Sequence, residues 1–226
     1  MGSYYSERLS AERLRRCYEI APPRVQQYLE AEIEYVAGRI GRGDVVLELG
    51  CGYGRVLERL AGKAGTLVGI DTSAPSLEMG RELLSAFQNC RLLQMDAVAL
   101  GFADRSFDVV CCIQNGISAF HVDKPALIAE AIRVTKPGGR VLFSSYSPNF
   151  WDARLEWFKL QADHGLLGEI DWDATGDGVI VCRDGFRATT IGPGEFESLT
   201  AGFDVDRRIE EVDRSSIFCE LVPRSQ

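Results

Sequence analysis

The stretch that decides the fold spans residues 44–55 and reads DVVLELGCGYGR. Its first half is an apolar run too short for a helix, which is typical of a strand covered on both faces of a parallel sheet. Gly50, Gly52 and Gly54 follow at alternate positions, and a helical pattern begins at Val56. Such a turn lets a ligand lie against bare backbone beside the free N–H groups of a helix start. It therefore predicts an approach loop for a phosphate or cofactor, although a tight turn without a ligand has the same pattern.

Length and composition favour one compact α/β unit. The chain has 226 residues, of which 46% are hydrophobic, enough for one sizeable core. Its net charge is −8, and residues 165–226 hold 13 acidic against 6 basic side chains. Nucleic-acid binding uses Lys and Arg to neutralise phosphates, so this charge argues against a nucleic-acid partner. The acidic region indicates either a solvated surface or a preference for neutral or cationic substrates.

Cysteine and histidine usage bears on metals and on the compartment. Seven cysteines occur without a Cys-x-x-Cys pair, and two histidines are too few to complete a metal site, so we expect no metal and reduced, buried thiols. The neighbours Cys111 and Cys112 would also suit a soft acceptor such as a metalloid. Because neither a signal-peptide pattern nor a span-length apolar run occurs, we expect a cytoplasmic protein without membrane contacts.

Acidic residues end the next two predicted strands. The apolar run at 66–70 ends in Asp71, 19 residues after Gly52. A carboxylate placed there accepts hydrogen bonds from the ribose hydroxyls of a nucleoside cofactor, and capping the helix predicted at 76–87 is its alternative role. The strand at 91–95 ends in Asp96 and Ala97, which are either an adenine-reading pair or ordinary turn residues.

A fourth strand at 107–113 and a fifth at 140–146 flank a helix predicted at 125–134. Gln114 follows the fourth strand, at the edge where open parallel sheets bind ligands. His121 comes soon after and is the nearby candidate for a general base, with helix capping or core packing as its alternatives.

Several motifs in order resemble one family. Residues 48–54 (ELGCGYG) look like motif I, and residues 101–110 (GFADRSFDVV) and 130–142 (EAIRVTKPGGRVL) look like motifs II and III, of the class I S-adenosylmethionine-dependent methyltransferases. The subgroup that they resemble contains quinone-ring and other small-molecule methyltransferases. With Asp71 these motifs lie within residues 45–146. The resemblance implies an α/β fold with a doubly wound, mostly parallel seven-stranded sheet of the Rossmann-like type.

The resemblance also implies S-adenosyl-L-methionine as cofactor and a small-molecule methyl acceptor. The glycine loop would contact the methionine part, Asp71 the ribose, and Gln114 the amino acid end. The implied cofactor-binding residues are Glu48, Gly50, Cys51, Gly52, Gly54, Asp71, Thr72, Asp96, Ala97 and Gln114. Because in-line methyl transfer depends mainly on alignment and water exclusion, a catalytic base such as His121 is needed only for a protonated acceptor.

The remaining segments are predicted as additions to one domain. Residues 1–42 form an N-terminal helical extension with a helix at 24–40, and residues 43–226 form the methyltransferase domain. The early part of the extension is either a lid over the glycine loop or a loosely packed segment. An aromatic helix at 150–164 and a hairpin at 176–190 make residues 150–192 an insertion near the substrate site. A helix at 193–201 and strands at 203–212 and 215–222 follow. Aromatic side chains that could either wall an acceptor pocket or pack in a core are Tyr4, Tyr5, Tyr146, Trp151 and Trp157.

Two other function classes share this kind of fold. An NAD(P)-dependent oxidoreductase requires a third glycine where Arg55 stands, and a hydride-transfer constellation such as Tyr-x-x-x-Lys that we do not find. A non-catalytic regulatory protein would bind S-adenosylmethionine but lack an acceptor pocket. The sequence alone names neither the acceptor nor the oligomeric state.

Overall fold

The computed structural model describes Tyr4 and residues 8–224. A seven-stranded sheet forms its centre, in the order β3-β2-β1-β4-β5-β9-β8. The strands are β1 (Val45–Leu49), β2 (Thr66–Asp71), β3 (Cys90–Gln94), β4 (Phe107–Cys112), β5 (Thr135–Tyr146), β8 (Val205–Val212) and β9 (Ser216–Pro223). The first five run parallel, and β9 pairs antiparallel with β5 and β8. The predicted doubly wound, mostly parallel sheet is confirmed.

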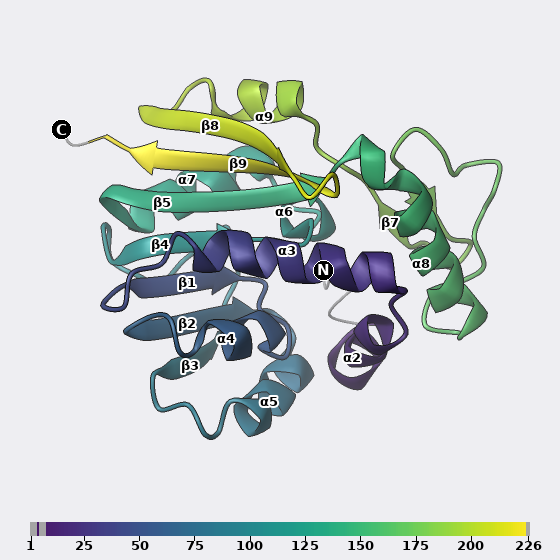
Figure 1. Cartoon of the computed structure of the whole chain (residues 1–226), viewed down its shortest axis with the longest axis horizontal. Coiled ribbons are helices and arrows are strands. Elements are labelled where there is room, and N and C mark those ends of the chain that lie inside the picture. The colour runs from purple at the N-terminus through teal and green to yellow at the C-terminus, as the bar shows by residue number, and fades with distance from the viewer. Residues whose placement is uncertain (1–3, 5–7, 225–226) are drawn as a thin grey trace.

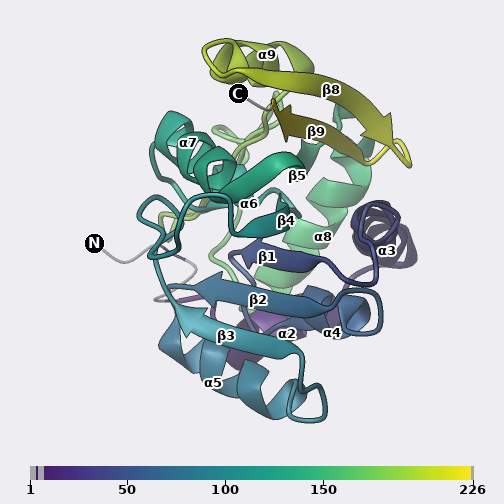
Figure 2. The ribbon, with the colours of Figure 1, turned by 90° about the vertical axis from the view of Figure 1, so that its left-hand side faces the viewer.

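Helices cover both faces of the sheet (Figures 1 and 2). One face carries α3 (Pro23–Ala37), α4 (Arg55–Leu60) and α5 (Ala74–Leu83), and the other carries α6 (Gly116–Ala119), α7 (Lys124–Val134) and α9 (Pro193–Thr200). Strands covered on both sides need apolar residues on both sides, and β4 is buried at every position except the half-buried Asp108. All seven cysteines lie among the described residues and are buried and free, as predicted.

A third apolar cluster lies beyond the carboxyl ends of the parallel strands, at the right of Figure 1. It joins α2 (Ala11–Glu19), η1 (Pro148–Phe150), α8 (Trp151–Asp163) and the antiparallel pair β6 (Ile180–Val181) and β7 (Arg187–Ala188). Trp157, Phe158 and Phe186 are buried in it. The aromatic helix and the hairpin predicted from sequence are therefore both present, and they sit at the ligand-binding edge of the sheet.

The structure differs from the sequence prediction at β5. Residues 136–139, Lys-Pro-Gly-Gly, were expected to break the chain between helix and strand, but the strand runs continuously from Thr135. Gly138 has a φ of +75°, and the pairing register with β4 shifts between Phe107 and Val109. The sheet thus absorbs the proline and glycines as an irregularity of the kind that a bulge provides.

None of the helices in residues 8–224 combines the length and apolar character that crossing a membrane requires.

Candidate functional site

The glycine turn after β1 has the strained backbone that its sequence predicts. Gly50, Gly52 and Gly54 have φ values of +75°, +54° and +85°, where residues with a Cβ are rare. The Gly50 N–H donates to the Ile70 carbonyl at 2.8 Å, which ties the turn to β2. A Cβ on Gly50 would collide with the Phe120 ring. The loop therefore needs glycine for both its turn and its packing.

Asp71 at the end of β2 holds this loop in place. Its two carboxylate oxygens accept from the backbone N–H groups of Gly52 at 2.9 Å and Ser73 at 2.8 Å. Burial raises the pKa of Asp71, and these N–H bonds oppose the rise. The cap of α5 is Ser73, whose hydroxyl accepts from the Ser76 N–H at 3.3 Å. The capping role that sequence reasoning allowed for Asp71 is thus taken by Ser73.

A cavity of about 360 Å³ opens above the glycine turn. Most of the expected cofactor-binding residues line it: Glu48, Gly50, Cys51, Gly52, Asp71, Thr72, Asp96, Ala97 and Gln114. Gly54 does not line it and instead begins α4, with its Cα packed near Leu84. His121 is exposed and is not among the lining residues, although its neighbours Phe120 and Val122 are. The structure thus brings nine of the expected cofactor-binding residues together around the cavity, whereas Gly54 and His121 lie outside it.

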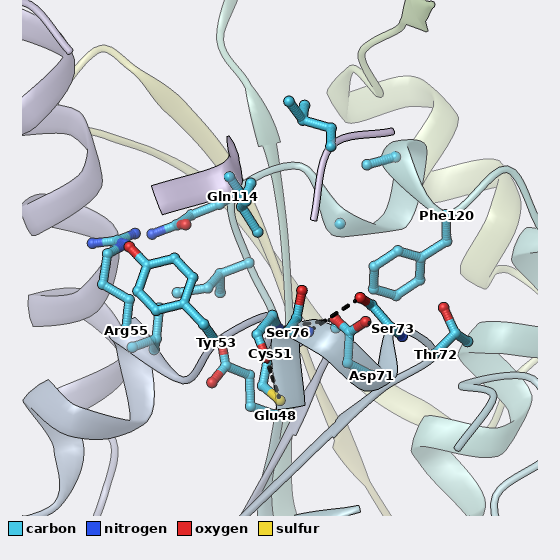
Figure 3. Close-up of a pocket in the computed structure, with 18 of the residues that line it drawn as sticks. Glu48, Cys51, Tyr53, Arg55, Asp71, Thr72, Ser73, Ser76, Gln114 and Phe120 are labelled. Carbon is cyan, nitrogen blue, oxygen red and sulfur yellow. Dashed lines mark hydrogen bonds between the residues drawn. The ribbon is translucent and has the colours of Figure 1, made fainter. Parts of the chain in front are cut away.

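Besides the Tyr28 hydroxyl, three buried polar atoms of the lining residues have no hydrogen-bond partner among the described residues: Glu48 Oε2, Arg55 Nη2 and Gln114 Nε2. Burial raises the pKa of Glu48 to about 8, while Arg55 lowers it and Asp71 raises it further. Figure 3 shows Arg55 and Gln114 near one another, with Asp71, Thr72 and Phe120 across the cavity. Buried polar groups are normally paired, so three together fit a ligand that carries both a carboxylate and an ammonium group.

Sequence reasoning missed Arg55 as a site residue. In the sequence, Arg55 was considered only because it stands where a dinucleotide-binding motif needs its third glycine. In the structure its guanidinium carbon lies 4.4 Å from the centre of the Tyr18 ring, a cation–π contact with α2. The direction of this side chain is set by a helix far away in sequence, and no local signal predicts it.

Helix α2 closes the cavity from above. The Ala11 N–H donates to Ser76 Oγ of α5 at 2.9 Å, and the Trp157 indole of α8 donates to the Cys17 carbonyl at 2.8 Å. Leu14 lies over the glycine turn, with its methyl carbon 3.1 Å from where a Gly52 Cβ would be. The helix therefore joins the β2 side of the site to the inserted segment.

Aromatic side chains also line the cavity. Of those expected, Tyr146 and Trp157 line it, while Trp151 packs in the neighbouring apolar cluster. Tyr4 contacts Phe186 of the hairpin region instead. Tyr5 lies outside the described residues. The lining aromatic residues that sequence reasoning did not name for this pocket are Tyr18, Tyr28, Tyr53, Phe120 and Phe158.

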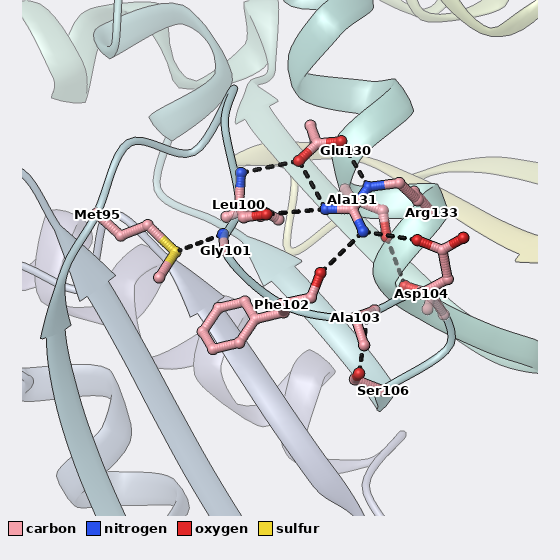
Figure 4. A network of polar contacts seen from close by, with 11 residues as sticks. Met95, Leu100, Gly101, Phe102, Ala103, Asp104, Ser106, Glu130, Ala131 and Arg133 are labelled. Atoms are coloured by element: carbon pink, nitrogen blue, oxygen red, sulfur yellow. Dashed lines mark hydrogen bonds and ion pairs between the residues drawn. The ribbon is translucent and has the colours of Figure 1, made fainter.

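The motifs at 101–110 and 130–142 have a structural role. Arg133 of α7 donates to the carbonyls of Leu100 at 3.0 Å and Phe102 at 2.9 Å, and to Asp104 at 2.7 Å (Figure 4). Glu130 binds Arg133 and accepts from the Leu100 N–H at 2.8 Å. One motif thus holds the turn made by the other.

Comparison with known proteins gives the same fold and a family. A family model described as "Methyltransferase domain" matches residues 46–139. Arsenite methyltransferase of Aquipseudomonas alcaligenes is 34% identical over 59% of this chain and 40% of its own length. A ubiquinone/menaquinone biosynthesis C-methyltransferase, UbiE, of Klebsiella pneumoniae subsp. pneumoniae is 36% identical over 81% of this chain and 73% of its own length. The chain thus spans less than half of the first relative and about three quarters of the second.

A crystal structure of an S-adenosylmethionine-dependent methyltransferase from Methanosarcina mazei has the same fold, with a TM-score of 0.61 at 20% identity over 84% of this chain and 98% of that one. The UbiE similarity covers the glycine turn, Asp71 and the central sheet together, because it extends over 194 residues. The chain therefore belongs to the class I S-adenosylmethionine-dependent methyltransferase family.

Proposed function

We propose that this protein transfers the methyl group of S-adenosylmethionine to a small, neutral or cationic molecule that contains an apolar ring. One observation carries the proposal: a single cavity is lined both by the polar residues of the glycine turn and the strand ends and by seven aromatic side chains. The relatives described above act, by name, in quinone biosynthesis or on arsenite, and both are small-molecule chemistries. The excess of acidic side chains also argues against nucleic acid as the acceptor.

The polar part suits each portion of the cofactor. Glu48 and Arg55 would pair with its ammonium and carboxylate groups, since both have a buried atom in need of a partner. Asp71 would accept from the ribose hydroxyls on the lone pairs that its two N–H bonds leave free. Asp96 and Ala97 would read the adenine edge. The bound cofactor supplies the electrophilic methyl group.

The chain's own contribution to the reaction is alignment and exclusion of water. Trp157, Phe158 and Tyr146 would hold a planar acceptor in line with the methyl group, and α2 covers the site. We propose no catalytic role for His121, because it is exposed outside the cavity lining. We also propose that residues 1–42 act as a lid on the methyltransferase domain of 43–226, and that residues 150–192 set acceptor preference.

Calorimetric titration with S-adenosylmethionine and S-adenosylhomocysteine tests the cofactor site. Asp71→Ala should weaken binding of both by about 10- to 100-fold, since it removes a charged acceptor and frees the Gly52 N–H. Asp163→Ala, at an exposed aspartate without a hydrogen-bond role, is the matched control and should bind as the unsubstituted chain does. Equal binding by both variants would contradict the assignment of Asp71.

An acceptor screen tests the reaction itself. The chain is incubated with S-adenosylmethionine and ring-containing small molecules, and S-adenosylhomocysteine and the methylated product are measured by mass spectrometry. Formation of both in equal amounts supports the proposed transfer. Tight cofactor binding with no product from any ring compound would instead favour the non-catalytic regulatory alternative.

A further inference from the structure

Glu32 is a fully buried carboxylate that the proposed reaction does not use. It lies on the inner face of α3, with 0% of its surface exposed. Its Oε2 accepts from the Gln114 N–H at 2.6 Å and from Ser144 Oγ at 2.9 Å. Its Oε1 accepts from Ser216 Oγ at 2.5 Å. One side chain thus joins α3 to β5, to β9 and to the residue that follows β4.

The fold of α3 does not require an acid at this position. The helix buries Leu29, Ile33 and Val36 on the same face, and a leucine at position 32 would extend that apolar stripe. Removing a carboxylate from water is costly even when hydrogen bonds compensate it, and apolar replacements of buried ionic groups are often as stable or more so. The acid therefore points to a role other than packing.

The residue that Glu32 holds is strained. Gln114 and Asn115 have φ values of +56° and +64°, two consecutive non-glycine residues in the left-handed region. Each such residue costs about 1 to 3 kcal/mol and persists only where its surroundings hold it. On the far side of the turn, the Ser145 hydroxyl donates to Asn115 Oδ1 at 2.8 Å. Glu32 and Ser144 hold the near side, through the Gln114 N–H.

The strained turn presents the Gln114 side chain to the cavity. Gln114 lines the cavity, and its Nε2 is a buried atom without a hydrogen-bond partner among the described residues. Its Oε1 lies 3.5 Å from the Tyr18 hydroxyl of α2. A rotation of this turn would move the amide away from both the cavity and α2.

We infer that Glu32 is a positioning residue, which holds the Gln114 turn through its N–H and so fixes the side-chain amide for the amino acid end of the cofactor. This inference rests on the cofactor site proposed above. An ionised acceptor makes the stronger hydrogen bond to an N–H group. Burial raises the pKa of Glu32 to about 7, and the bonds from Ser216, Gln114 and Ser144 lower it.

The titratable groups that face Glu32 come from four elements. Tyr28 lies on its own helix, Arg55 at the start of α4, Cys112 at the end of β4 and Tyr146 on β5. Of these, Arg55 favours the ionised carboxylate.

Titration with S-adenosylhomocysteine tests this inference, because its dissociation constant does not depend on turnover. Glu32→Leu keeps the volume and loses the acceptor, and it should weaken binding about tenfold. Glu32→Gln keeps an acceptor oxygen for the Gln114 N–H and should stay within about threefold of the unsubstituted chain. Glu34→Gln, at an exposed acid on the same helix, is the matched control and should change nothing.

A purely structural role is excluded by Ser216→Ala, which removes a hydrogen bond to Glu32 but none to Gln114. It should lower the thermal midpoint and leave the dissociation constant unchanged. The inference is overturned if Glu32→Leu binds normally, or if Ser216→Ala weakens binding as much as Glu32→Leu does. Binding that follows this pattern without any methyl transfer would refute the proposed reaction alone.

Should Glu32→Leu not fold, the pH dependence of binding decides instead. The dissociation constant of the unsubstituted chain should change between pH 6 and 8, as Glu32 titrates near its pKa of about 7, by more than that of Glu32→Gln. Other groups, Glu48 included, titrate in both proteins and cancel in the comparison. Identical profiles would overturn the inference.

Discussion

Replacing Glu48 with glutamine should remove much of the pH dependence of stability in the cofactor-free protein. Glu48 is 4% exposed at the base of the cavity, and burial raises its pKa from 4.5 to about 8. A carboxyl whose pKa is higher in the folded than in the unfolded chain stabilises the fold in its protonated form. This contribution is fully present below pH 4.5 and is lost as the pH rises through about 8.

The size of the effect follows from the two pKa values. At about 1.4 kcal/mol per pKa unit, the gap between 4.5 and about 8 corresponds to about 5 kcal/mol over the whole range. Integrating the linkage relation between pH 6 and 8.5 alone gives a loss of about 2.5 kcal/mol in the free energy of unfolding. Glu48→Gln cannot titrate and should lack this loss.

Urea unfolding of both proteins at these two pH values provides the assay. The quantity of interest is the difference between the two pH-induced losses, because titratable groups that do not interact with Glu48 contribute equally to each protein. Glu78→Gln, at an exposed acid of α5, is the control and should lose stability as the unsubstituted chain does. If Glu48→Gln loses as much stability as the unsubstituted chain over this range, the carboxyl is hydrated and ionised in the folded protein, and our reasoning about its desolvation is refuted.

Two further substitutions probe the closure of the site and the far side of the sheet. Trp157→Phe loses the 2.8 Å bond to the Cys17 carbonyl, worth about 1 kcal/mol, and part of a buried ring, so α2 should be cleaved at least about fivefold faster in limited proteolysis. An unchanged cleavage rate would show that Trp157 does not hold the helix. Burial raises the pKa of Glu220, but hydrogen bonds from Arg39 and Arg140 hold it below its ordinary value. Glu220→Gln removes a buried carboxylate that pairs with Arg39 and with the exposed Arg140, while Arg39 keeps Glu210, and it should cost about 2 kcal/mol at neutral pH. A carboxyl whose pKa is lowered by folding stabilises the folded chain fully only above its unfolded pKa of 4.5. The difference in thermal midpoint between the variant and the unsubstituted chain should therefore narrow as the pH falls below 4.5. A difference that stays constant would exclude ionised Glu220 as the cause of the stability loss.

The sequence predicts those parts of the fold that short-range patterns determine. The apolar run before Gly50, the helix of α7 and the hairpin near Gly185 each follow from spacing and turn residues within about ten positions. The strand runs past Pro137, but residues 136–139 pair with neither β4 nor β9, so the local preference for a turn survives as an irregularity within β5.

The site residues also differ in whether a short-range sequence pattern predicts them. Asp71 stands out because it ends a strand, but its bond to Gly52 crosses between two strands and is visible only in the structure. Arg55 and Tyr18 are 37 positions apart in the sequence, and no local sequence pattern predicts their contact. Glu32 did leave a signal, since a charged residue interrupts the apolar stripe of Leu29, Ile33 and Val36.

The position of α2 has a consequence for the way the chain is made. Its anchoring partners Trp157, Gly165 and Leu166 lie far along the chain, whereas the glycine turn and Asp71 come soon after it. During synthesis from the N-terminus, the nucleoside-binding edge can form while α2 still has nothing to hold it down on the insertion side. This early helix is thus among the last to settle, and a nascent chain offers the cofactor an open site that the finished protein covers.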